Sequence, residues 1–154
     1  MPGAKLPLLL LALALLASAA RAQLQSGGND AIRLTVSQNA DGSRTAYETD
    51  PANRKAVATT TSRDGKPMGT VRYTLDEAGR YATGEVLGPK GEFRFNTAYK
   101  YDEVSGKLRE ETQSTRDGKV SLKLVYAYDS NGRPAGYSVY DGSGKLIGQT
   151  TRKR

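Results

Sequence analysis

The sequence predicts an all-β protein, an antiparallel meander of about ten short strands, on the basis of three observations. A unit of 26 to 27 residues repeats along the chain, marked by a tyrosine that stands three residues before an aspartate. Apolar and polar residues alternate within the units, as in strands with one buried face. Glycine-bearing turns separate these stretches. A repeat of this length indicates stacked hairpin units. The tyrosine–aspartate pairs are Tyr47–Asp50, Tyr73–Asp76, Tyr99–Asp102 and Tyr126–Asp129.

The first 22 residues have the features of a secretory signal peptide. Lys5 gives a basic start, Leu6 to Leu16 is an apolar run, and Ala20 to Ala22 fits a small-residue cleavage motif. We therefore expect cleavage near Ala22–Gln23 and export to the periplasm or the extracellular space. No second long apolar run follows, so we expect no membrane span in the mature chain.

The composition of the mature chain indicates a thinly packed domain. The full sequence has no cysteine and a net charge of +7, of which Lys5 and Arg21 of the signal peptide account for two. Without disulfides, stability has to come from strand pairing and packing. The low aliphatic content approaches that of disordered chains, whereas the repeat and its tyrosines indicate an ordered fold, which we favour.

The predicted strands run from the start of the domain to its end. Residues 23–31 are expected to form a flexible N-terminal segment, residues 32–150 the repeat domain and residues 151–154 a basic tail. The first strand alternates Ile32, Leu34 and Val36 with Arg33 and Thr35, and an Asp-Gly turn follows it.

Within the repeats, a strand that carries tyrosines alternates with a more polar return strand. The clearest tyrosine strand is Phe93 to Tyr101, followed by Val120 to Tyr128, with a weaker version at Gly69 to Leu75. Because the repeat keeps its register, we expect the tyrosines to lie on one face of the sheet. The return strands are Lys55 to Ser62, Arg80 to Leu87, Lys107 to Ser114 and Ala135 to Tyr140, joined by turns that contain Asp-Gly, Asn-Gly or Gly-Pro pairs.

Three of the units are similar to the YD repeats of RHS-type proteins, whose pattern is Y-x-Y-D-x-x-G-R-L. The stretches that carry the resemblance are Tyr73 to Arg80, Tyr99 to Leu108 and Tyr126 to Arg133. The unit from Tyr47 to Arg54 is degenerate, with Thr49 in place of the second tyrosine and Asn53 in place of glycine. The resemblance spans roughly residues 45 to 149. It implies an extracytoplasmic array of β-hairpins; in that family long arrays enclose a toxic cargo, which four units could not do.

The residue types argue against catalysis and against a cofactor. The chain has no histidine and no cysteine, so the usual general base and the usual zinc ligands are missing. Glu110 and Glu111 form a visible carboxylate pair, but neighbours on a strand point to opposite faces and do not converge on one substrate. We therefore predict a protein that is not an enzyme and has no metal site. Clustered oxygens at Asp129 to Gly132 and Asp141 to Gly144 leave calcium as a weaker alternative.

The turn aspartates Asp50, Asp76, Asp102 and Asp129 are predicted to be structural, because aspartate at the first position of a turn accepts backbone N–H bonds. Basic residues recur after these turns, at Arg54, Arg80, Lys107 and Arg133. The simpler interpretation is that each is a solvated charge near its turn aspartate. The alternative is a cationic ladder that binds an acidic polymer.

The tyrosines are the candidate binding residues. Tyr73, Tyr99, Tyr101, Tyr126 and Tyr128 are expected to form a stripe across neighbouring strands. In one interpretation this stripe is a partly buried ladder that stabilises a sheet poor in aliphatic residues. In the other it is an exposed platform that stacks against sugar rings.

These observations favour a non-enzymatic secreted or periplasmic repeat protein with a structural or protein-interaction role at the cell envelope. The alternative is a carbohydrate-binding module that uses the tyrosine stripe. The candidate partners are an envelope protein, a polysaccharide, or another copy of the chain bound through a sheet face or edge. Nucleic acid is not expected, because the basic residues are scattered and the chain is predicted to be exported.

Overall fold

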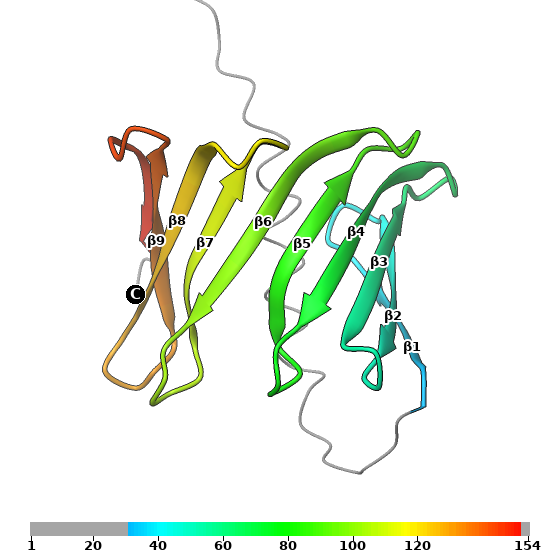
Figure 1. The fold of residues 1–154 in the computed structure, drawn as a ribbon, viewed down its shortest axis with the longest axis horizontal. Helices are drawn as coiled ribbons and strands as arrows, with labels where there is room; N and C mark the ends of the chain where they lie inside the picture. The colour runs from blue at the N-terminus through cyan, green and yellow to red at the C-terminus, as the bar shows by residue number, and fades with distance from the viewer. Residues whose placement is uncertain (1–30, 152–154) are drawn as a thin grey trace, which may run out of the picture.

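Ten antiparallel strands form one sheet in the computed structural model of the protein, which describes residues 31–151 (Figure 1). The strands follow one another in chain order across the sheet, so every neighbour is joined by a hairpin. This confirms the predicted all-β meander. The strands are β1 (Arg33–Gln38), β2 (Arg44–Asp50), β3 (Lys55–Thr61), β4 (Pro67–Leu75), β5 (Tyr81–Leu87), β6 (Phe93–Tyr101), β7 (Leu108–Ser114), β8 (Val120–Tyr128), β9 (Pro134–Asp141) and β10 (Leu146–Thr151).

The predicted signal peptide at residues 1–22, all but the last residue of the predicted flexible segment, and residues 152–154 of the predicted tail lie outside the described residues. Among residues 31–151, no helix is long and apolar enough to cross a membrane.

The turns of the meander gather at two opposite ends of the sheet (Figure 1). The turns that follow a tyrosine–aspartate pair, which join β2 to β3, β4 to β5, β6 to β7 and β8 to β9, lie at the lower end. The turns from β3 to β4, β5 to β6, β7 to β8 and β9 to β10 lie at the upper end. A repeat of two strands therefore places the aspartates of the four tyrosine–aspartate pairs, Asp50, Asp76, Asp102 and Asp129, along a single rim.

Every hairpin from β3–β4 onward contains a β-bulge, and in each case the extra residue lies in the second strand. A bulge increases the local right-handed twist and bends the strand that carries it. The hairpins β1–β2 and β2–β3 pair without a register shift. The repeated bulges account for the twisted and bent sheet of Figure 1. The extra residues are Met68, Ala82, Arg94, Arg109, Ser121, Ala135 and Ile147.

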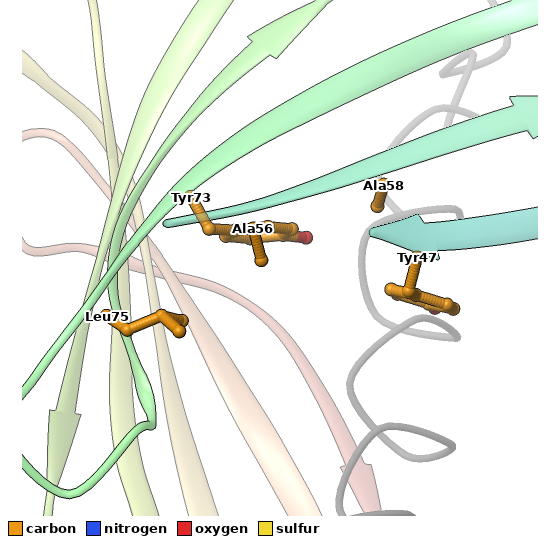
Figure 2. Packing of buried hydrophobic residues seen from close by; sticks show 5 residues of the cluster. All are labelled: Tyr47, Ala56, Ala58, Tyr73 and Leu75. Carbon is orange, nitrogen blue, oxygen red and sulfur yellow. The ribbon is translucent and has the colours of Figure 1, made fainter. Parts of the chain in front are cut away.

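One face of the sheet, here called the tyrosine face, carries most of the buried side chains. A cluster on it combines two tyrosines with Ala56, Ala58 and Leu75 (Figure 2). Tyr47 pairs with Ala58 across β2 and β3, and Tyr73 pairs with Ala56 across β3 and β4. Small residues opposite tyrosines leave room for the rings on the sheet. The other face, here called the outer face, carries charged and hydroxyl side chains.

The edge strand β1 points its aliphatic side chains to the outer face. Leu34 pairs with Glu48 and Val36 with Ala46, and the two side chains are 70% and 63% exposed. The alternation in the sequence marks a strand, but its apolar side does not cover the core. On the tyrosine face β1 instead presents Arg33, Thr35 and Ser37, which lie opposite residues of β2.

Candidate functional site

The centre of the tyrosine face is a group of aromatic rings around Tyr73. The rings of Tyr73 and Tyr81 stack with their centroids 4.1 Å apart, and Tyr99 lies 6.3 Å from both. Tyr73 is only 6% exposed. Gly84 lies across from it, and a Cβ atom there would come within 3.2 Å of the Tyr73 ring and 2.8 Å of Thr97. The absent side chain of Gly84 is therefore what lets the Tyr73 ring lie against the sheet.

The electrostatics of these rings match their burial. Loss of hydration raises the pKa of Tyr81 to about 12 and that of Tyr73 well above its usual value. Burial also raises the pKa of Tyr99, and the nearby Glu111 carboxylate adds to the effect. These phenols stay protonated at physiological pH, so they act as neutral rings and as hydrogen-bond donors.

A fully buried carboxyl group, Glu111, lies next to this aromatic group. Its side chain is 0% exposed and accepts hydrogen bonds from the Tyr126 hydroxyl at 3.1 Å and the Thr97 hydroxyl at 3.3 Å. Burial raises the pKa of Glu111, and the donors Tyr126, Thr97 and Gln113 offset part of that rise. Leu124, opposite Glu111 on β8, is also fully buried. An acid in such surroundings favours its neutral form, because burial penalises the charged carboxylate.

Glu110 lies on the other face of the same strand, as the alternation of side chains requires. It accepts a hydrogen bond from Lys100 Nζ at 3.0 Å, and Lys123 Nζ lies 3.7 Å from its second oxygen. Partial burial raises the pKa of Glu110, but the two lysines outweigh this and hold it below its usual value. The adjacent carboxylates therefore serve separate surroundings and do not form a pair.

The second tyrosine of the Y-x-Y-D pattern joins successive units. The Tyr101 hydroxyl donates a hydrogen bond of 2.8 Å to the Tyr81 carbonyl, and the Tyr128 hydroxyl donates one of 2.7 Å to the Leu108 carbonyl. Each bond reaches back twenty residues, to the first residue of the strand that follows the preceding tyrosine–aspartate turn: Tyr81 begins β5 and Leu108 begins β7. We call each of these contacts an inter-unit lock.

A cation covers the ring in each inter-unit lock. The Arg80 guanidinium lies 4.4 Å from the centroid of Tyr101, and Lys107 Nζ lies 5.3 Å from that of Tyr128. Cations over aromatic rings are attracted to the negative face of the π system. Two of the four basic residues of the predicted ladder are thus engaged with tyrosines of the next unit.

The turn aspartates organise the lower rim. Asp76 Oδ1 accepts the backbone N–H groups of Ala78 and Arg80, and Asp129 Oδ1 accepts those of Asn131 and Arg133. Partial burial raises the pKa of Asp76. Its hydrogen bonds and the charge of Arg80, 2.7 Å away, lower the pKa by more than burial raises it, so the net shift is downward.

The other two turns vary this arrangement. Asp102 accepts the N–H and the hydroxyl of Ser105, and it forms an ion pair of 3.4 Å with Arg109. Asp50 accepts the N–H and the side-chain amide of Asn53. The left-handed backbone conformation in that first turn belongs to Arg54, with φ of 51°. The repeat pattern aligns Asn53 with the glycine of the other units, but the residue that takes the glycine conformation in this turn is Arg54. The reason is that the Arg54 N–H, one residue later, closes the turn on the Pro51 carbonyl.

The outer face contains a trough with a volume of about 630 Å³ that crosses β3 to β7. Short side chains in its lining, such as Thr83 and Ala98, leave it open. Arg72 and Glu85 form an ion pair of 3.5 Å within it and remain substantially exposed. Charged and hydroxyl groups line it together with the aliphatic side chains of Val57 and Ala98, and most of its exposed lining is apolar. Nothing in the sequence marks these residues as neighbours, since they come from five strands.

The predicted binding tyrosines thus divide into two groups. In the first group, the rings of Tyr73 and Tyr99 lie 6.3 Å apart and the Tyr126 hydroxyl donates to Glu111. In the second group, Tyr101 and Tyr128 form the inter-unit locks. Among residues 31–151, no group of three or more acidic side chains could hold a metal ion. The Asp129 and Asp141 carboxylates, the alternative calcium ligands, accept backbone N–H groups of their own turns.

No protein-family model matches the sequence, and a search of curated proteins found no match.

Proposed function

We propose that the protein is an exported, non-enzymatic repeat protein that serves at the cell envelope as a structural element or as a docking surface for another envelope protein. The predicted signal peptide supports export to the periplasm or beyond, and the YD-like units support an extracytoplasmic role. The ten-stranded sheet gives the chain a broad, bent surface with two chemically different faces.

The observation that carries this proposal is the internal use of the tyrosines. Tyr73 and Tyr81 cover each other by stacking, and the hydroxyls of Tyr101, Tyr126 and Tyr128 bond to groups of the same chain. Cations cover the rings of the inter-unit locks. A platform for sugar rings needs free aromatic faces, whereas these faces hold the sheet together. The contacts therefore favour a structural framework over a carbohydrate-binding stripe.

The outer-face trough is the surface that this framework offers to a partner. Its exposed Arg72 and Glu85 carry opposite charges, and threonine and asparagine side chains flank them. Such a surface fits a protein segment that supplies charges of both signs in the complementary order, with apolar groups beside them to cover the aliphatic lining of the trough. Exposed charges of this kind set specificity and respond to salt.

The test is retention of the exported chain on fractionated envelope material, washed at low and at high salt. The variant Arg72→Glu places two like charges in the trough, and Lys119→Glu makes the same charge change in the exposed β7–β8 turn. We expect salt-sensitive retention that Arg72→Glu abolishes and Lys119→Glu leaves intact. Protease treatment of the envelope fraction should also remove it.

Retention that survives protease treatment and depends on Tyr101 or Tyr128 would replace the proposal with the carbohydrate-binding module. Equal loss of retention in both charge variants would show that net charge, and not the trough, governs the interaction. A chain that no envelope fraction retains would contradict a docking role.

A further inference from the structure

The β1 edge of the sheet exposes a row of aliphatic side chains. Ile32, Leu34 and Val36 are 61%, 70% and 63% exposed. Leu34 and Val36 lie on the outer face of an edge strand, next to Glu48 and Ala46 of β2. A solvent-exposed aliphatic row on an edge strand is a ready template for pairing with another strand.

The opposite edge of the same sheet is protected in ways that β1 is not. β10 carries a bulge at Ile147, follows Lys145 directly, and leads into the sequence Arg152-Lys153-Arg154. Bulges and basic side chains are the usual means by which edge strands avoid pairing. β1 pairs with β2 in unbroken register over all six of its residues, and its one charged residue, Arg33, lies on the tyrosine face.

We propose that β1 is a dimer interface, at which the strand pairs antiparallel with β1 of a second copy of this chain and extends the sheet across a two-fold axis near Thr35. This inference does not depend on the proposed envelope function. In that register Leu34 lies opposite Val36 of the second copy, so four aliphatic side chains adjoin on the outer face. Thr35 meets its own equivalent, a favourable cross-strand pair.

The charges of the edge also select this arrangement. Arg33 lies opposite Ser37 of the second copy, so the two arginines do not face each other. Pairing of β1 with β10 of another copy would be heterologous and open-ended, and it would bring the basic end of β10 to a strand that itself carries an arginine. The two-fold arrangement closes after two copies.

The experiment measures the molecular mass of the exported chain in solution over a range of concentrations, by sedimentation velocity and light scattering. The double variant Leu34→Lys/Val36→Lys places lysines opposite lysines across the axis at positions that are exposed within one chain. The control Leu146→Lys/Ile147→Lys makes the same change at the β10 edge, where the two side chains are 49% and 55% exposed. We expect a dimer whose dissociation constant rises by at least about tenfold in the β1 variant and stays unchanged in the control.

A mixed sample provides the rescue. Combining Leu34→Lys/Val36→Lys with Leu34→Glu/Val36→Glu should restore a heterodimer, because each lysine then meets a glutamate. A chain that stays monomeric at all concentrations would overturn the proposal. So would a dimer that the β1 variant leaves intact, or one that the β10 variant disrupts.

Discussion

The two halves of the tyrosine face use one repeated position in different ways. Across from the first tyrosine of each unit, the paired residues are Ala58, Gly84, Glu111 and Tyr137 in chain order. In the N-terminal half the small partners let rings pack flat, and the centre is aromatic. In the C-terminal half Glu111 and Tyr137 replace them, and the centre is a hydrogen-bonded carboxyl group. A single cross-strand position thus sets the chemistry of each half while the architecture stays the same.

The largest expected effect comes from emptying the aromatic half. Tyr73→Ala removes a ring that is 6% exposed and contacts Tyr81 and Tyr99, so it should leave a cavity and lower the free energy of unfolding by about 3–5 kcal/mol. Urea denaturation of the variant and the parent measures the difference. Val104→Ala, at a side chain that is 98% exposed, is the control and should change nothing. A small effect at Tyr73 would mean that the rings do not form the core of the sheet.

The strands, the turns and the shared face of the tyrosines could be predicted from the sequence, because they follow from the alternation of apolar and polar residues and from the positions of the glycines. The sequence does not reveal which carboxylate becomes buried. Tyr101 lies opposite Leu108 next to the turn. If the two strands then paired without a bulge, Glu110 would lie across from Tyr99. The bulge at Arg109 shifts the register by one, so Glu111 takes that place and Glu110 meets the lysines of the outer face.

The outer-face trough is a second feature that could not be predicted from the sequence. Its floor joins side chains of β3 to β7 that are close only because five strands keep a common register. Each of these residues alone is an ordinary exposed position on a strand. Likewise, the exposure of Leu34 and Val36 depends on which face of β1 turns toward the tyrosines, and the alternation of the sequence fits either face.

The C-terminal half should lose stability as the pH rises, because it contains the buried carboxyl group of Glu111. Because burial raises the pKa of Glu111 above its usual 4.5, the folded state binds a proton that the unfolded state has already released. Stability from this group is therefore full below pH 4.5 and falls as the pH rises toward the raised pKa. In Glu111→Gln the amide can keep both hydroxyl contacts without ionising.

The measurement compares the unfolding free energies of Glu111→Gln and the parent from pH 4 to pH 8. Taking the difference cancels the turn aspartates, whose lowered pKa values act in the opposite direction. We expect the variant to gain on the parent as the pH rises, by about 1.4 kcal/mol for each unit of raised pKa. A difference that stays constant with pH would show that Glu111 titrates normally in the folded chain.

A pair of matched hydroxyl deletions sharpens the contrast between the halves. Tyr126→Phe removes a donor to the buried Glu111 carboxylate and should cost about 1.5–3 kcal/mol. Tyr47 is equally part of the tyrosine face, but within residues 31–151 its buried hydroxyl only approaches the Ser37 hydroxyl, and the two fall short of hydrogen-bond geometry. Tyr47→Phe should therefore leave the stability unchanged or raise it slightly. Equal losses in the two variants, by thermal or urea unfolding, would contradict the difference between the halves.

Among the variants that should lose stability, the smallest losses are expected at the two inter-unit locks, those of Tyr101 and Tyr128. Tyr101→Phe and Tyr128→Phe each delete one hydrogen bond to a backbone carbonyl and keep the ring beneath its cation, so each should cost about 1 kcal/mol. The two bonds join different strand pairs but meet at the cross-strand pair Tyr101–Leu108, so the loss in the double variant should differ from the sum by about 0.5 kcal/mol or more. Urea unfolding of the two single variants and the double variant tests this. A double-variant loss equal to the sum would mean that the two locks act independently although Tyr101 of one lock lies opposite Leu108 of the other.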